Sequence, residues 1–204
     1  MKFIGFIGVA AVLAGSLAGC GWSRFQSGSD PQGYWLPLTV LVRFDPSVTG
    51  AMVPYTDACQ QPQTISAGTQ LTHAFRRELG LAFERVRVDG TDPKQAVDGE
   101  LEVSIGLKDV GMAIPRKADK SQPATVRLGG TVVFRNQAGA VLYTKSLRTD
   151  LEGEVRTTRE SCDVSGLAEV INQAGLILAQ GIKKNLGTSV KLQEYAGQRA
   201  AAKR

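Results

Sequence analysis

Three consecutive stretches in the middle of the chain alternate apolar and polar residues, and this alternation constrains the fold more than any other feature. In the first stretch, apolar residues occupy every second position: Leu101, Val103, Ile105 and Leu107. The second stretch runs from Val126 to Phe134 and the third from Val141 to Leu151. A period of two residues is typical of strands with one buried and one solvated face. The pattern therefore predicts antiparallel strands, and Asn136 to Gly139 predict the hairpin turn between the second and the third.

Two other segments carry the period of an α-helix. Between Ser66 and about Ala82, large apolar residues recur at every fourth position, and between Leu167 and Leu186 the apolar residues follow a 3.6-residue period. Ser165 is a suitable N-cap for the second helix, and Gly187 is a suitable residue to end it.

The remaining strand signals are shorter. Leu38 to Phe44 is almost continuously apolar and predicts a buried strand, and Val86 to Val88 predicts another. The segment through Cys59 and Pro62, rich in Pro and Thr, is interpreted as a loop. The element order predicts an α+β fold: a mixed β-sheet of about four to five strands with two α-helices packed on one face, in the order β-α-β-β-β-β-α.

The N-terminus has the layout of a secretory signal peptide. Lys2 is followed by an apolar and small run from Phe3 to Gly19 without an acidic residue. The run is too short for a permanent transmembrane helix, which needs about 20 apolar residues. It ends in Leu17-Ala18-Gly19-Cys20, which resembles the lipobox of bacterial lipoproteins.

The lipobox resemblance implies cleavage before Cys20 and diacylation of its sulfur, which would hold the protein on a membrane. An ordinary cleaved signal peptide that happens to precede a cysteine is the alternative. In lipoproteins an Asp after the lipidated cysteine favours the inner membrane. Because Gly21 stands at that position, the resemblance implies the periplasmic face of the outer membrane.

Four regions follow from these signals. Residues 1–19 are expected to be the signal peptide, 20–33 the lipidated cysteine and a tether, 34–187 an α/β sandwich domain, and 188–204 a basic C-terminal tail. Removing Lys2 with the signal lowers the formal charge from +5 to +4, a mild basic excess that predicts no nucleic-acid partner. The tail is expected either to fray in solvent or to touch anionic lipid.

Two cysteines remain after Cys20 is lipidated. Export places Cys59 and Cys162 in an oxidising compartment, where an even pair predicts a disulfide; two separate thiols are the alternative. Each cysteine shortly precedes a predicted helix, so parallel helices packed side by side would bring the two together. A metal site is not expected, because two distant cysteines and the single His73 lack the spacing of zinc ligands.

The sequence contains no pattern that argues for catalysis or a cofactor. It lacks a nucleophile elbow, a phosphate loop and a dinucleotide fingerprint. His73 lies away from the apolar stripe of its helix and is interpreted as an exposed surface residue. Glu100 and Glu102 share the solvated side of a strand, which explains them better than a catalytic carboxylate pair does.

With these elements in order, the chain resembles the small α/β periplasmic lipoproteins of the Gram-negative envelope, which include the lipopolysaccharide-assembly lipoprotein and auxiliary lipoproteins of transport systems. The residues that carry the resemblance are Leu71 to Val88, Thr131 to Phe134 before the turn, and Leu167 to Leu186. The Cys59/Cys162 pair and the basic tail depart from the assembly lipoprotein. The resemblance implies the compartment and the fold more than a particular role.

These features together predict a non-enzymatic accessory lipoprotein that binds an envelope protein or glycolipid. A self-assembling structural component is the first alternative, since a mixed sheet has open edges, and a periplasmic hydrolase with an unrecognised site is the second. The candidate binding loop contains Arg116, Lys117 and Lys120, although a flexible, solvated loop explains these residues better.

Overall fold

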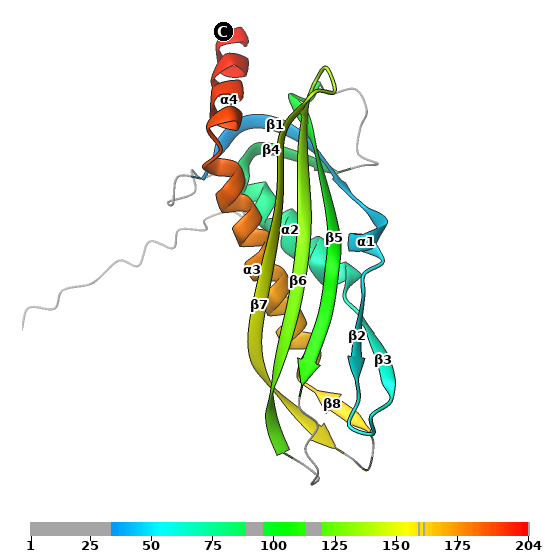
Figure 1. Cartoon of the computed structure of the whole chain (residues 1–204). Helices are drawn as coiled ribbons and strands as arrows, with labels where there is room; N and C mark the ends of the chain where they lie inside the picture. Colours follow the sequence, from blue (N-terminus) through cyan, green and yellow to red (C-terminus); the bar gives the residue numbers. More distant parts are fainter. Residues whose placement is uncertain (1–33, 89–95, 113–119, 159, 161, 204) are drawn as a thin grey trace, which may run out of the picture.

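The structure, a computed structural model, describes residues 34–88, 96–112, 120–158, 160 and 162–203. Eight strands and four helices follow one another along these residues (Figure 1). The strands are β1 (Leu36–Phe44), β2 (Met52–Thr56), β3 (Pro62–Ser66), β4 (Phe83–Val88), β5 (Gly99–Met112), β6 (Lys120–Asn136), β7 (Val141–Thr158) and β8 (Asp163–Ser165). The helices are α1 (Pro46–Thr49), α2 (Gly68–Ala82), α3 (Leu167–Gly187) and α4 (Val190–Ala202).

Six of the strands form one mixed sheet in the order β4-β1-β5-β6-β7-β8. β1 lies parallel to both β4 and β5, because α2 and the segment after β4 return the chain to the same end of the sheet. β5, β6, β7 and β8 follow as an antiparallel meander. The long strands of this meander twist and curl around the helices (Figure 1).

The predicted hairpin turn joins β6 to β7. The Asn136 side chain accepts hydrogen bonds from the backbone N–H groups of Ala138 and Ala140, at 3.0 and 2.9 Å. Gly139 has a φ of +78°, a conformation that glycine adopts without steric cost. These local interactions set the register of the two longest strands.

The inner face of the sheet and the buried stripes of α2 and α3 form the core. Every second residue of β5 from Leu101 to Ile105 is buried, as the sequence pattern predicts, and so are Val126, Leu128, Val132 and Phe134 of β6. Phe75 of α2 is also fully buried. The opposite face of the sheet carries mostly polar side chains, which are exposed or half-buried.

The predicted fold class is wrong in its inventory of elements. The structure has a six-stranded sheet, a second sheet formed by β2 and β3, and four helices, whereas the sequence predicts four to five strands and two helices. The missed elements are short or carry weak signals. β8 has three residues, α1 has four, and Pro54 and Pro62 lie in the β2–β3 ribbon, where proline weakens the strand signal.

The C-terminal segment also differs from the expected tail. Val190–Ala202 is the helix α4, which buries Leu192 and Ala196 against the body. The folded part of the chain therefore extends past residue 187. None of the helices in the described residues combines the length and the apolar character that a membrane span requires.

Candidate docking face on helices α2 and α3

Helices α2 and α3 lie side by side and run in the same direction. Leu71 near the start of α2 packs against Gly175 of α3, and Glu78 further along α2 pairs with Lys183 further along α3. The close approach near Leu71 depends on the missing side chain of Gly175. The two helices cover the sheet with their apolar stripes and leave their outward sides open, because no other described element covers them.

A buried ion pair joins the two helices. The Glu78 side chain is 3 % exposed, and its Oε2 lies 3.0 Å from Nζ of Lys183, whose side chain is 12 % exposed. The Nε of Arg77 lies 3.8 Å from the other carboxylate oxygen. The pair fixes the relative positions of the helices, and the carboxylate contributes almost no negative charge to the surface above it.

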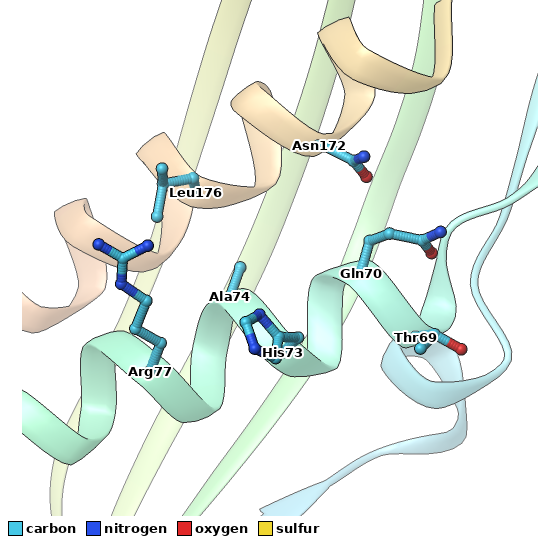
Figure 2. A pocket seen from close by; sticks show the side chains of 7 residues that line it. All are labelled: Thr69, Gln70, His73, Ala74, Arg77, Asn172 and Leu176. Atoms are coloured by element: carbon cyan, nitrogen blue, oxygen red, sulfur yellow. The ribbon is translucent and has the colours of Figure 1, made fainter.

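A groove of about 380 Å³ lies between the two helices. Figure 2 shows Gln70, His73 and Arg77 rising from α2, and Asn172 and Leu176 rising from α3 across the groove. Most of the surface that lines the groove is apolar, with polar groups at its rim. We call this groove, together with two further hollows along the same helices, the α2–α3 face.

Two further hollows lie along these helices, one beside the groove and one on α3. A hollow of about 350 Å³ shares Thr69 and His73 with the groove and is also lined by Thr49, Gly68, Thr72 and Arg76. Another of about 390 Å³ lies along the C-terminal half of α3 and is lined by Tyr34, Ile177, Gln180, Gly181, Lys183 and Lys184. The linings of the groove and both hollows contain four cationic side chains, one of which, Lys183, is neutralised by its pair with Glu78; among the described residues the linings contain no carboxylate.

The lining of the groove combines apolar, hydrogen-bonding and cationic groups. The groove offers an apolar floor, hydrogen-bonding amides and a positive rim, which match an amphipathic anionic partner. His73 is exposed, as predicted, and neither a carboxylate nor a cysteine lines the groove beside it. Among the described residues, no group of three or more His, Cys, Asp or Glu side chains is arranged to hold a metal ion.

A second charged cluster surrounds Asp98 and has a structural role. Its carboxylate accepts hydrogen bonds from Nε of Arg199 at 3.0 Å, from Nζ of Lys203 at 2.8 Å and from the Thr39 backbone at 2.8 Å. The Tyr195 hydroxyl donates to the Asp98 carbonyl. Burial raises the pKa of the Asp98 carboxyl, but the hydrogen bonds from Lys203, Thr39 and Arg199 outweigh burial and lower the pKa below its usual value. The cluster therefore fastens α4 to the sheet.

The structure joins the predicted cysteine pair in a disulfide. Cys59 lies in the turn between β2 and β3, and Cys162 lies just before β8, with their Cα atoms 5.1 Å apart. Asp57 shapes the turn by accepting hydrogen bonds from the backbone of Cys59 and Gln61, at 2.8 and 2.9 Å. The bridge therefore ties the β2–β3 ribbon to the end of the long meander.

The side chains of the other predicted site residues lie outside the part of the chain that the structure describes. Cys20, Arg116 and Lys117 lie outside the described residues. Lys120 begins β6, but its side chain also lies outside the description. The candidate binding loop thus remains a prediction.

The α2–α3 face was not predicted from the sequence. Arg76 and Arg77 lie on the first predicted helix, and Leu176 and Ile177 lie on the second. Nothing in the sequence indicates that the two helices pack side by side. The available signal was the distribution of charge. The outward positions of α2 carry Arg76 and Arg77, while its carboxylate, Glu78, occupies a buried position.

Comparisons with known proteins show likeness in fold only. No protein-family model matches the chain, and no curated protein matches its sequence. The crystal structure of protein XCC0632 from Xanthomonas campestris, of family DUF330, is similar at a TM-score of 0.51 and 10% identity, over 85% of this chain and 93% of that one.

Two lipoproteins are more remote in structure. Lipoprotein B from Nitrosomonas europaea has a TM-score of 0.45 at 10% identity, over 81% of this chain and 94% of that one. A minor lipoprotein from Acinetobacter baumannii has a TM-score of 0.40 at 9% identity, over 73% and 91%. These two likenesses are too distant to add to the assignment. The chain shares the fold of the Xanthomonas protein.

Proposed function

We propose that the protein is a lipid-anchored, non-enzymatic accessory protein of the bacterial envelope that docks a partner protein on its α2–α3 face. The lipobox-like sequence from Leu17 to Cys20 supports the anchor, and Gly21 after the cysteine supports the outer membrane and its periplasmic face. Oxidising export agrees with the Cys59–Cys162 disulfide. The cationic, partly apolar groove supports docking.

The absence of carboxylates from the lining of the α2–α3 face is the observation that carries the docking role. Arg76, Arg77 and Lys184 are exposed there, while Glu78 is buried and paired. Such a surface attracts an acidic partner over long distances and selects it by charge, while the apolar floor supplies contact area. A groove between two parallel helices is also an elongated site, which suits a helical segment of a protein.

Site-specific photo-crosslinking in cells tests this role. A photoreactive phenylalanine analogue would replace Gln70, His73 or Gln180 on the α2–α3 face, with Ala138 in the exposed β6–β7 turn as the control position. We expect one adduct of protein mass from the groove positions and none from Ala138. Arg77→Glu should remove most of the adduct, because it opposes an acidic partner, whereas Arg135→Glu on the sheet should leave it.

Two results would contradict the proposal. If the groove positions yield no adduct that the Ala138 position does not also yield, the face is not a docking site. If the adduct contains lipid instead of a second polypeptide and its added mass resists protease, the partner is an envelope glycolipid. The proposal of a protein partner is then wrong.

A further inference from the structure

Strand β7 leaves most of one edge of the sheet open. β7 pairs with β6 along its length, but β8 pairs only with Arg156, Thr157 and Thr158. Among the described residues, no strand pairs with the other side of β7 from residue 142 to residue 155. An open edge of this length is a template for another strand, and natural proteins usually shorten, bend or cover such edges.

We propose that this edge pairs with the β7 strand of a second copy of the chain, antiparallel and with the two-fold axis at Thr149. The six-stranded sheets of the two copies then join into one continuous sheet. The same surface contacts itself in such a dimer, so each contact occurs twice. The register is argued from the side chains on the two faces of β7.

The charges on the outer face of β7 are self-complementary in this register. Arg148 of each copy lies opposite Asp150 of the second copy. The other two carboxylates on that face, Glu152 and Glu154, lie opposite the hydroxyl groups of Ser146 and Thr144. Opposite charges in directly facing positions stabilise an antiparallel pair, and like charges destabilise it.

Several neighbouring registers bring like charges together. Moving the axis to position 148 places Arg148 opposite itself, and moving it to position 150 places Asp150 opposite itself. An axis at position 151 sets Asp150 against Glu152. A shift by one residue on one strand alone would place outer side chains opposite inner ones. The register centred on Thr149 avoids facing like charges and pairs opposite ones. An axis at position 147 also avoids like charges, but it sets Arg148 opposite Ser146 and Asp150 opposite Thr144, so the opposite-charge pairs are lost.

The inner face of β7 is compatible with the same register. Leu147 and Leu151 are both half-buried at the open edge. In this register Leu147 of each copy lies opposite Leu151 of the second copy. Lys145, the one inner-face charge in this stretch, lies opposite Gly153. On the helix layer behind, Ile177 is 44% exposed, and the neighbouring Gly181 approaches Leu147. Pairing would cover this apolar edge.

Within one copy, Arg148 and Asp150 already form an exposed ion pair with a 3.0 Å separation, and their side chains are 56% and 52% exposed. Pairing exchanges this contact for the equivalent contact between copies. The charges therefore select the register, while backbone hydrogen bonds and the leucine contacts supply the affinity. This dimer does not depend on the proposed docking role.

Charge exchange tests the register. We expect analytical ultracentrifugation of the full chain in detergent, at about 10 μM, to show a dimer. Arg148→Asp and Asp150→Arg should each weaken it by roughly tenfold or more, because each creates two facing like-charge pairs. The double variant Arg148→Asp/Asp150→Arg should restore it. Circular dichroism of each variant checks that the fold is retained.

Cysteine crosslinking tests the same contact independently. Ser146→Cys/Glu152→Cys places facing cysteines across the predicted axis, whereas the two positions lie about 20 Å apart within one strand. We expect an oxidised covalent dimer from this variant and little from Ser146→Cys/Glu154→Cys, whose register is offset by two. A monomeric wild-type chain would overturn the proposal. So would a dimer that persists in both single charge variants and crosslinks equally in both registers.

Discussion

Among single residues, Asp98 joins segments that lie far apart along the chain. Its buried carboxylate joins the backbone of β1 to two cations of the C-terminal segment. A hydrogen bond to a charged group contributes about 1.5–3 kcal/mol when it is well formed. Removing this carboxylate should therefore loosen α4 from the sheet.

Asp98→Asn should lower the free energy of unfolding by about 1.5–3 kcal/mol, because Arg199 and Lys203 lose their charged acceptor. Urea denaturation monitored by circular dichroism measures the change. Asp109→Asn is the matched control. Its pair with Arg127 is exposed, with side chains 47% and 41% exposed, so the loss should stay below about 1 kcal/mol. Equal effects of the two substitutions would contradict the structural role of Asp98.

The Asp98 cluster also predicts a dependence of stability on pH. The pKa of the Asp98 carboxyl in the folded protein lies below the ordinary value of about 3.9. A carboxyl with a lowered pKa stabilises the fold above its unfolded pKa and loses that contribution as the pH falls through the folded pKa. Stability should therefore fall from about pH 4 downward, and the fall should be smaller in Asp98→Asn. Identical acid-unfolding profiles for the two proteins would count against this assignment.

Asp98 shows why side-chain clusters escaped sequence reasoning. Its partners Arg199 and Lys203 are 101 and 105 residues away along the chain. A periodic pattern reports the environment of neighbouring residues only. The same limit applies to Arg77 and Leu176, which line one groove because two helices happen to pack together.

At the scale of elements, long periodic segments were predictable and short or irregular ones were not. The predicted helix from Ser66 to about Ala82 is α2, and the predicted helix from Leu167 to Leu186 is α3. The start of α3 differs from the predicted cap: Ser165 lies in β8, and Gly166 with φ +90° is the N-cap of α3. The β2–β3 ribbon was missed because Ile65 is its only half-buried residue on β3, so an apolar alternation is absent there.

Two glycines of α2 should respond to alanine in opposite ways. A Cβ at Gly68 would overlap the Thr49 carbonyl of α1, which belongs to the backbone, whereas a Cβ at Gly80 would meet no atom within 4 Å. Gly80→Ala should stabilise the fold by about 0.5–1 kcal/mol through helix propensity. Gly68→Ala should destabilise it by about 1–3 kcal/mol through overpacking. Thermal unfolding of both variants measures the difference, and stabilisation by Gly68→Ala would show that α1 does not approach α2 so closely.

At the scale of the whole molecule, the disulfide covalently joins two segments that lie far apart along the chain. Cys59 and Cys162 are 103 residues apart, and the bridge connects the β2–β3 ribbon to the end of the meander. The pairing could be predicted from the sequence, because export and an even number of cysteines suffice for that inference; the compartment itself stays a prediction. The strand order around the bridge required the structure.

Removing the bridge should lower the free energy of unfolding by about 2–5 kcal/mol, because the unfolded chain gains the entropy of an open loop. The double variant Cys59→Ser/Cys162→Ser is compared with the wild-type protein in the presence and absence of a reductant. The reduced wild-type protein and the double variant should unfold at the same urea concentration, below that of the oxidised protein. Equal midpoints for the oxidised and reduced wild-type protein would mean that the bridge is absent or contributes nothing.

The proposed membrane anchor decides where the whole molecule acts, and the intact mass of the protein purified from membranes tests it. We expect a polypeptide that begins at Cys20 and carries acyl chains, with Cys59 and Cys162 protected from alkylation until reduction. Cys20→Ser should release the protein from the membrane fraction. An unacylated chain that begins elsewhere would contradict the anchor and leave a secreted domain with the same fold.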